Sequence, residues 1–431
     1  MVALAQARQD ALETRLAALA LPEGGGWLGA ARREALARLT AAGLPGRRDE
    51  YWKYTDPAAL NAAEAAPAKV FVADDEAPGF GAIDRLRLVF VDGVFDAERS
   101  DDPALAGVEI EQLARAGQAD IHWARDLYGA LEARGQKPVA RPLATLNTAF
   151  AGQGVLIRAT GRAAKPVHLV YERGSEAADA LLHHCIRVEE GAELTLLETG
   201  AGAARLQTVM EVEVADGAAF HHIRSQGRDH ERRMVTHIFA RLGRESRFKS
   251  FTLSVNGRLA RNEAVLELLG DDAVAHLAGA AAGDGDAFHH DDTVFVTHAA
   301  ERCESRQVFK KVLKNGAVGV FQGKILVTQD AQKTDGYQIS QSLLLDGDSQ
   351  FLAKPELEIY ADDVKCSHGS TSGAIDETAL FYLRARGVPL ADAQALLVLA
   401  FLAEAIDEIE DEAIADEVRG KLEGWLARRK G

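Results

Sequence analysis

Hydrophobic and polar positions divide the chain into three zones. Residues 1–150 are mixed α/β: apolar side chains recur at helical spacing, for example over 27–42, but alternate over 85–100 around a predicted strand–turn–strand at Asp92-Gly93. After residue 372 this spacing returns, and it is strongest over 390–409. Apolar residues at i, i+3, i+4 and i+7 form one face of an amphipathic helix. We therefore predict a mostly helical N-terminal domain over 1–150 and a C-terminal helical domain over 373–431.

Residues 151–372 show a different pattern, in which apolar and polar residues alternate with the period of two that is typical of β-strands. Repeatedly, an alternating strand meets a turn and a second strand follows. The turn glycines are Gly191, Gly217, Gly243, Gly270, Gly316 and Gly347. The first intervals between them are nearly equal, which is typical of stacked coils that bury each other's apolar faces. A sandwich of antiparallel hairpins would give the same local pattern, so periodicity alone leaves both architectures open.

The interval from Gly270 to Gly316 is longer than the others. It contains residues 279–292, which are rich in alanine, glycine and aspartate. We therefore expect one coil to carry an inserted loop there. Under either architecture the fold class is mainly β with helical ends.

Composition narrows the classes of function. The 431 residues carry 49 Lys+Arg against 65 Asp+Glu, a formal net charge of −16, which argues against a nucleic-acid partner because phosphates require a basic face. The 3 scattered cysteines are too few for a disulfide framework and favour a reducing compartment. No stretch approaches the roughly 20 apolar residues of a membrane span, so we expect a cytoplasmic protein without a membrane partner. A G-x-x-x-x-G-K-[ST] phosphate loop is missing, so this chain is not expected to bind a nucleotide.

Histidines supply the first candidate chemistry. Most of the 13 lie between His183 and His298, and the densest groups are residues 183–185, 221–222 and 289–292. Imidazole, thiolate and carboxylate all bind transition metals. Adjacent residues of a strand face opposite sides of the sheet, however, so a His-His pair rarely holds one ion. We therefore interpret each pair first as hydrogen-bonded rings at the sheet surface.

A sharper candidate is the pair Cys366 and His368. Because they are two positions apart, their side chains project to the same face of an extended chain. A thiolate and an imidazole there would form half of a site for iron or an iron–sulfur cluster, and the other ligands would come from elsewhere, such as a second subunit. The alternative interpretation of Cys366 is a packed, inert thiol.

Longer motifs surround this pair. The string PELEIYADDVKCSHGSTSGAIDETALFYLRARGVP covers residues 355–389, and two further strings cover 289–313 and 320–345. Near the N-terminus RRDEYWKYTD covers residues 47–56. Together these strings resemble the SufB/SufD family of iron–sulfur cluster assembly proteins, and specifically its SufD branch.

The resemblance implies a right-handed parallel β-helix core over 151–372 and a non-catalytic scaffold subunit of an ATP-dependent complex. It implies a heterodimer with SufB through the β-helix core, and binding of the SufC ATPase through the C-terminal helices around Leu396–Ile409. Nascent clusters would form at the SufB–SufD interface, with His368 and Cys366 as candidate metal ligands of the iron or transient iron–sulfur cluster. An unpaired β-helix face also favours a homodimer of the isolated chain.

Two other functions stay open. The protein would be purely architectural if it only holds SufB and SufC in place and has no ligands of its own. A β-helix enzyme acting on polysaccharide would need two carboxylates set apart across a groove. The acidic pairs Asp291-Asp292 and Asp362-Asp363 do not fit this requirement, because neighbours on a strand point apart.

Overall fold

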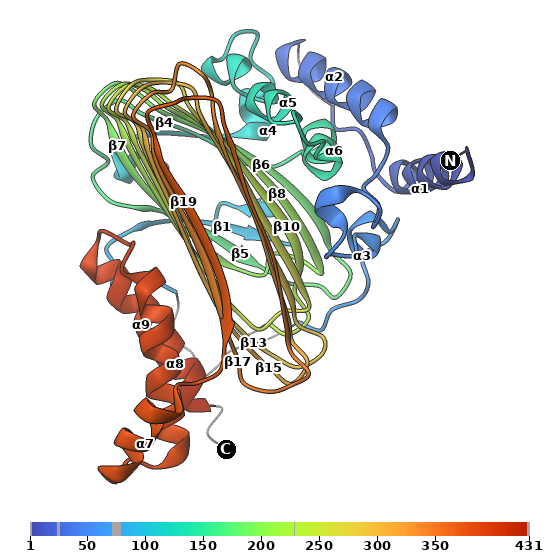
Figure 1. The fold of residues 1–431 in the computed structure, drawn as a ribbon. Coiled ribbons are helices and arrows are strands. Elements are labelled where there is room, and N and C mark those ends of the chain that lie inside the picture. The colour runs from blue at the N-terminus through green and yellow to red at the C-terminus, as the bar shows by residue number, and fades with distance from the viewer. Residues whose placement is uncertain (1, 24–25, 71–78, 228, 429–431) are drawn as a thin grey trace.

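The computed structural model describes residues 2–23, 26–70, 79–227 and 229–428. Its core consists of two facing, mostly parallel β-sheets (Figure 1). Sheet A has 10 strands: β1 (Leu86–Val91), β2 (Val94–Asp96), β5 (Val167–Glu172), β7 (Glu193–Gly200), β9 (Ala219–Gln226), β11 (Arg247–Val255), β13 (Val274–Asp284), β15 (Glu304–Lys314), β17 (Asp335–Leu344) and β19 (Lys365–Gly373). Sheet B has 9 strands: β3 (Glu109–Gln112), β4 (Val155–Ala159), β6 (Asp179–Val188), β8 (Arg205–Val214), β10 (Arg233–Leu242), β12 (Leu259–Leu268), β14 (His289–His298), β16 (Val318–Val327) and β18 (Gln350–Ile359).

Consecutive strands from β4 to β19 alternate between the two sheets, so each coil contributes one strand to each sheet. Within a sheet, neighbouring strands of successive coils pair in parallel, as β10 does with β12 along its whole length. Among the described residues, antiparallel pairing is confined to β1 with β2 and β3 with β4. The core is therefore a parallel β-helix, which confirms the predicted fold class and excludes the hairpin sandwich.

One corner of the β-helix repeats an unusual backbone conformation. Where the chain passes from sheet B to sheet A, one residue has a positive φ in six successive coils, from β6–β7 to β16–β17; these residues are Gly191, Gly217, Glu245, Asp272, Arg302 and Lys333. Each donates its backbone N–H to a carbonyl of the next corner, as Gly217 does to Arg244 at 2.8 Å. The corners therefore stack through hydrogen bonds, and the repeat follows this conformation rather than the glycines themselves.

The prediction of an inserted loop is wrong. Residues 279–284 complete β13 and residues 289–292 begin β14, with a turn at Gly285 between them. Gly270 lies between β12 and β13, whereas Gly316 lies at the opposite corner, between β15 and β16. The long interval between these two glycines is thus a change of corner and not an insertion.

The space between the sheets is filled by the inward-facing side chains of both. Phe220 and Phe248 of sheet A pack in one cluster with Leu206 and Met210 of sheet B, and all four are buried. Complete burial of each large apolar side chain contributes about 1.5–3 kcal/mol. The residues between them on each strand point outward, because successive side chains alternate between faces.

Helices cover the outer faces of both sheets (Figure 1). The N-terminal set consists of α1 (Val2–Ala17), α2 (Gly26–Ala42), α3 (Ala58–Asn61), α4 (Leu113–Ala116), α5 (Ala130–Arg134) and α6 (Pro142–Phe150), with single turns at Glu50–Trp52, Pro103–Ala106 and Trp123–Asp126. The C-terminal set consists of α7 (Glu377–Ala385), α8 (Leu390–Ile406) and α9 (Glu412–Arg428). Helix α6 packs on β6 and β8 of sheet B, whereas α8 packs on β13 and β15 of sheet A.

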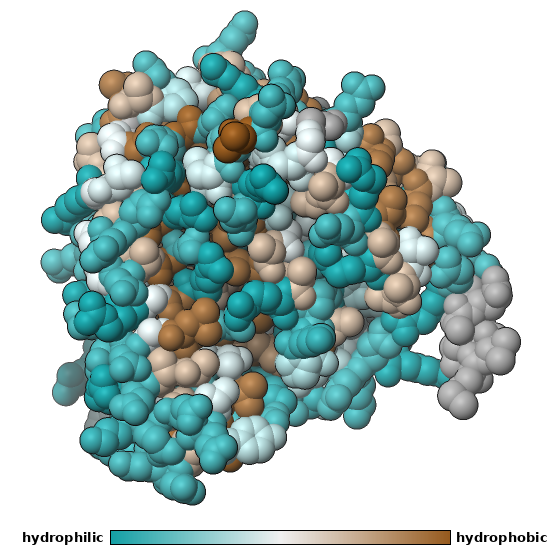
Figure 2. Space-filling view, turned by 90° about the horizontal axis from the view of Figure 1, so that it is seen from above, coloured by the Kyte–Doolittle hydropathy of each residue, from teal (hydrophilic) through white to brown (hydrophobic). Residues whose placement is uncertain are grey.

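The surface of the molecule is mainly hydrophilic on the face shown in Figure 2, where apolar residues form only small patches. This agrees with the strongly acidic composition, which gives a net charge of −16. Within the described part of the chain, no helix has the length and apolar character needed to cross a membrane.

The β-helix has two unlike ends. At the first end, the short antiparallel strands β2 and β3 lie on the edges of the two sheets. At the other end, the full-length strands β18 and β19 are the last strands of sheets B and A. Short edge strands discourage pairing with another chain, whereas long ones favour it. We call the end formed by β18 and β19 the open end.

Candidate functional site

Cys366 and His368 lie on β19, the last strand of the β-helix, which runs along the front of Figure 1. In the parallel register they stand opposite Gly336 and Gln338 of β17. Cys366 packs in the cluster around Ile325, which faces the space between the sheets. The spacing of two therefore places His368 on the same, inner side of the strand. The predicted pair lies at the open end.

The surroundings of Cys366 favour a packed thiol. Its sulfur is half-buried, and a Cβ added to Gly336 would lie 3.2 Å from it. Burial raises the pKa of the Cys366 thiol, although a backbone hydrogen bond from Gly336 opposes this shift. Because only the thiolate is a strong nucleophile or metal ligand, Cys366 is not primed for either role in the isolated chain.

His368 is in a different situation, because its side chain is exposed. Its imidazole forms no hydrogen bond or ion pair with any residue that the structure describes. Behind it, the Gln338 side chain is completely buried, and neither of its amide atoms has a partner among the described residues. The open end thus leaves an exposed imidazole and a buried amide without partners among the described residues, and for the buried amide of Gln338 this state is rare.

Two serines hold β19 in place beyond this pair. Ser370 Oγ lies 3.0 Å from Ser340 Oγ, and Ser372 Oγ lies 2.9 Å from Ser342 Oγ. These hydrogen bonds join the inner rows of β17 and β19. The outer edge of β19 has no strand beside it within the described chain. Its unpaired backbone N–H and C=O groups offer a template for a strand of another chain.

The C-terminal helices continue from the open end. Helix α7 has no buried residue, and Phe381 and Tyr382 on it expose 68% and 63% of their surface. Helix α8 instead buries Val398 and Leu402 against sheet A. Much of the apolar stripe for which the family resemblance implied a docking role is therefore buried inside this chain. The large apolar side chains that stay exposed on these helices are Phe381 and Tyr382 of α7 and Leu390 and Leu396 of α8.

The interior of the β-helix contains a feature that sequence reasoning missed. A chain of hydrogen-bonded polar side chains crosses several coils between the sheets; its members are Tyr171, His184, Glu198, His222, Arg224, Thr236, Asn262, His290, Asp292 and Lys311. Arg224 connects the two sheets, because it bonds Glu198 of sheet A at 2.8 Å and Thr236 of sheet B at 2.8 Å. Alternation along the strands does indicate inward positions, but not which polar residues meet there.

Charge pairing stabilises this row of hydrogen-bonded side chains inside the β-helix. Burial alone would raise the pKa of Glu198, but Arg224 and His222 outweigh it and hold this pKa well below its ordinary value. Burial lowers the pKa of His184 to about 4 and that of His290 to about 3. These two imidazoles are therefore neutral at pH 7, while Glu198 is ionised and paired with Arg224.

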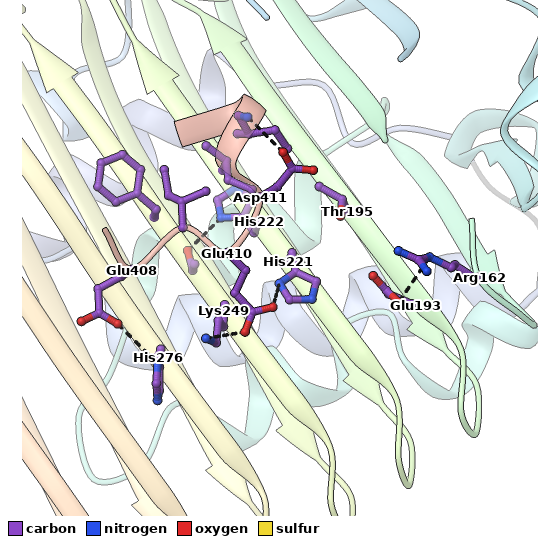
Figure 3. A pocket seen from close by; sticks show the side chains of 15 residues that line it. Arg162, Glu193, Thr195, His221, His222, Lys249, His276, Glu408, Glu410 and Asp411 are labelled. Carbon is purple, nitrogen blue, oxygen red and sulfur yellow. Dashed lines mark hydrogen bonds and ion pairs between the residues drawn. The ribbon is translucent and has the colours of Figure 1, made fainter. Parts of the chain in front are cut away.

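A pocket of about 230 Å³ lies on the outer face of sheet A, beneath the loop between α8 and α9 (Figure 3). Glu410 from the loop lies 2.5 Å from Lys249 Nζ and 3.8 Å from His221 Nδ1. Glu408 lies 3.4 Å from His276 Nδ1. These ion pairs join the C-terminal helices to the strands. The pocket lining is acidic overall, because it contains four carboxylates but only two cationic side chains, Arg162 and Lys249.

The histidine pairs follow the alternation expected for strands. In each pair one ring faces inward and the other outward: His222 bonds the interior Glu198, whereas His221 faces Glu410 in the pocket. His290 bonds the interior Lys311, whereas His289 lies 2.9 Å from Thr55 of the N-terminal segment. The two rings of neither pair converge on one point.

Comparisons with known proteins agree with the architecture. Residues 171–401 match the family model described as "SUF system FeS cluster assembly, SufBD core domain". The iron–sulfur cluster assembly protein SufD of Escherichia coli is 30% identical over 404 residues, which cover 90% of this chain and 90% of that protein. A SufBD-family iron–sulfur cluster assembly protein of Synechocystis is 28% identical over 90% of this chain and 89% of its own length. The chloroplastic protein ABCI7 of Arabidopsis thaliana is 30% identical over 56% of this chain and 52% of its own. The chain belongs to the SufB/SufD family of iron–sulfur cluster assembly proteins, and within it to the SufD branch.

Proposed function

We propose that this chain is a non-catalytic scaffold subunit for iron–sulfur cluster assembly, that it pairs with SufB through the open end, and that it binds the SufC ATPase through its C-terminal helices. The observation that carries the proposal is the open end itself. The long strands β18 and β19 follow each other in sequence and form the last edges of the two facing sheets. His368 lies on β19, and its side chain has no partner in the described chain.

Pairing through the open end follows from the properties of edge strands. Addition of a strand to an exposed edge forms a new ladder of backbone hydrogen bonds, and alternating side chains give specificity. Here both sheets end at the same side of the molecule, so a partner β-helix with a similar end would extend both at once. His368 would then lie in the seam between the two subunits.

In this proposal, iron and the nascent cluster are substrates that pass through the seam. His368 supplies one neutral imidazole ligand, and the partner supplies the sulfur-bearing cysteine. Gln338 stands directly opposite His368 and offers amide groups without partners among the described residues. Imidazole and thiolate together suit iron and iron–sulfur clusters. Cys366 is the weaker candidate ligand, because burial raises the pKa of its thiol.

The ATPase would bind near the C-terminal end of β19, where α7 follows. Helix α7 follows β19 after a short connection and presents Phe381 and Tyr382 to solvent. Exposed aromatic residues are typical anchors of protein–protein interfaces. A pull on α7 by a nucleotide-driven movement of the ATPase would reach β19 directly. We divide the chain accordingly into an N-terminal domain (1–150), the β-helix core (151–372) and the docking helices (373–431).

A purely architectural subunit is the second candidate, and the environment of Cys366 favours it. A half-buried thiol with a raised pKa behaves as a small apolar side chain. If His368 also serves only to pack against the partner, the protein would hold SufB and SufC without touching iron. Both candidates predict the same partners, so only experiments on the two residues separate them.

The test is His368→Ala in the reconstituted complex with SufB and SufC. We expect the complex to form, while cluster assembly, followed by the visible absorbance of the cluster, falls strongly. Thr371→Ala is the matched control, since it lies on the same strand with its side chain on the outer face.

Normal assembly in the His368→Ala complex would remove this residue from the chemistry and support the architectural candidate. Loss of the complex itself would show that His368 acts in pairing. Anaerobic iron binding, compared between the unmodified complex, His368→Ala and Cys366→Ser, then decides whether either side chain is a ligand.

A further inference from the structure

A second group of metal-binding side chains lies far from the open end. His183 and Cys185 of β6 and Glu211 of β8 are each completely buried. One ligand atom from each residue lies within 4.8 Å of the other two. The group is on the outer face of sheet B, and β10, β12, β14 and β16 separate it from β18. It is therefore distinct from the Cys366–His368 pair.

The β-helix brings these three residues together through its regular geometry. His183 and Cys185 are two positions apart on β6, so they share a face. The parallel register places Glu211 directly opposite Cys185. His184 points to the interior instead, where it lies 3.2 Å from Tyr171 Oη. The cluster thus combines one imidazole, one thiol and one carboxyl group at neighbouring positions of two strands.

The two nitrogens of the His183 ring differ in their contacts. The Nε2 atom lies 2.8 Å from Glu211 Oε2, so an ion shared by the two residues would bind Nε2 in place of this hydrogen bond. The ring proton would then lie on the other nitrogen, Nδ1. Nδ1 has no hydrogen-bond partner in the part of the chain that the structure describes, although it is buried. Buried polar atoms without partners are few in native proteins, and each calls for an explanation.

We propose that His183, Cys185 and Glu211 bind a divalent first-row transition metal ion of the zinc or ferrous type. Nitrogen, sulfur and oxygen donors together suit these ions, whereas Mg²⁺ and Ca²⁺ select oxygen ligands alone. Three protein ligands leave a further coordination position, as in zinc sites that bind an exchangeable group.

Other roles of the residues explain only part of the arrangement. Glu211 also accepts hydrogen bonds from the backbone N–H groups of Gly129 and Glu132, and so holds α5 against sheet B. This accounts for a buried carboxylate. It does not account for the buried imidazole of His183 and the buried thiol of Cys185 beside this carboxylate. The Tyr128 ring, 4.1 Å from the His183 ring, covers the cluster and fixes the imidazole.

An ion would reach the site from the N-terminal helices. A surface groove there is lined by Trp27, Tyr128, Gly129 and Ala130 among others. Gly129 lines this groove and also contacts Glu211 through its backbone N–H. One layer of backbone therefore separates the groove from the cluster. Burial raises the pKa of the Cys185 thiol, so the sulfur carries its proton in the metal-free chain. Binding would release this proton to solvent as the sulfur bonds to the metal, so affinity would increase with pH.

The probe is Co²⁺, added without oxygen to the full-length chain after treatment with a chelator. We expect one tightly bound equivalent, a charge-transfer absorption from thiolate to cobalt, and displacement by Zn²⁺. Cys185→Ser should abolish the charge-transfer band, and His183→Ala should weaken binding. Cys303→Ser is the matched control: Cys303 is also buried, but its sulfur lies 3.3 Å from the carbonyl oxygen of Gly270 and outside the cluster, so the band should persist.

Two results would overturn the proposal: no thiolate band on the folded chain, or a band that survives Cys185→Ser. A band that disappears with Cys366→Ser instead would place the metal at the open end and would also refute this site. If Cys185→Ser does not fold, Cys185→Ala provides the test, because it removes the sulfur ligand without placing a hydroxyl group in a buried site. Unchanged Co²⁺ affinity in a folded Cys185→Ala protein would then count against the cluster. The cluster assembly measured for His368 is an independent readout, so the two proposals can fail separately.

Discussion

Glu198 and Arg224 form an ion pair inside the β-helix, with Glu198 Oε2 2.8 Å from Arg224 Nε and both side chains almost inaccessible to water. The same carboxylate oxygen lies 2.6 Å from His222 Nε2. Glu198 therefore contacts both Arg224 and His222 of the next coil. An ionised pair at this depth is stable only while both partners are present, because a lone buried charge has no solvation.

Glu198→Ala should therefore lower the free energy of unfolding by about 3–5 kcal/mol, as is typical when one partner of a buried ion pair is removed. Glu213→Ala is the control, since Glu213 bridges Arg187 and Arg241 on the partly exposed outer face. Exposed pairs contribute about 0–1 kcal/mol, so this change should have a small effect. Urea unfolding at pH 7 measures both, and equal losses would contradict the role of burial.

Acid should destabilise the protein well before its carboxylates are protonated. Burial lowers the pKa of His168 and His290 to about 3 and that of His184, His237 and His298 to about 4. The unfolded chain binds protons at these rings near pH 6.5, whereas the folded chain does not until about pH 4. Each such ring should therefore lower the free energy of unfolding by up to about 1.4 kcal/mol per pH unit as the pH falls from 6.5 toward the folded-state pKa of that ring.

Denaturant unfolding at pH 7, 6 and 5 tests this expectation. His298→Gln is the informative variant, because burial is the only cause of the lowered pKa at His298. Its curve of stability against pH should be shallower than that of the parent protein. Parallel curves would show that His298 does not contribute to the acid sensitivity.

The stacked corner provides a prediction about backbone strain. Glu245 adopts φ 54°, in the left-handed region that costs a residue with a Cβ about 1–2 kcal/mol. Glu245→Gly should relieve this cost and raise the free energy of unfolding by about 1 kcal/mol after the greater freedom of glycine in the unfolded chain is included. Thermal unfolding followed by circular dichroism measures the gain, and a lower melting temperature would contradict it.

The reverse change tests the same corner. Gly217→Ala should lower the free energy of unfolding by about 1–2 kcal/mol, because Gly217 has φ 66°. No atom lies within 4 Å of an added Cβ, so the loss would come from backbone strain and not from crowding. Gly161→Ala is the matched control, because its surroundings are equally empty and its φ is not positive. Equal effects at the two glycines would show that the corner conformation carries no strain.

Charges on the last strand should block pairing. Ser367 and Thr371 are exposed on the outer face of β19, and lysine is a natural protection of edge strands. The double change Ser367→Lys and Thr371→Lys should greatly reduce co-purification with SufB, while Val94→Lys on β2 at the opposite end should not. Co-purification that survives the double change would place the partner elsewhere on the molecule.

Much of this fold can be predicted from its sequence. The helices over 27–42 and 390–409 lie where their spacing indicates, as α2 and α8, and the period of two marks the coils. The length of the coils is harder to predict, because glycines do not occupy the same corner position in every coil. Gly191 and Gly217 occupy the left-handed position, but Glu245 and Asp272 occupy it in the next two coils. Stacked hydrogen bonds hold those residues in a conformation that their own preference disfavours.

The candidate sites show a similar division. Spacing alone places Cys366 and His368 on one face, and it separates His183 from His184. It does not reveal that Glu211, 26 residues beyond Cys185, stands opposite the thiol, since this depends on the number of residues in each turn of the chain. Nor does it reveal the interior contact between Arg224 and Thr236, which joins opposite sheets.

The parallel stacking has a geometrical consequence for assembly. Every coil lengthens the β-helix by one strand spacing of about 4.8 Å. The number of coils therefore sets the distance between the first end, with its short strands, and the open end. Duplication or deletion of a coil between β10 and β15 would shift β19 by one strand spacing relative to the N-terminal helices, but it would not change β19 or α7. A partner that binds only α7 and β19 would still bind. A partner that also contacts the N-terminal helices would no longer fit both contacts.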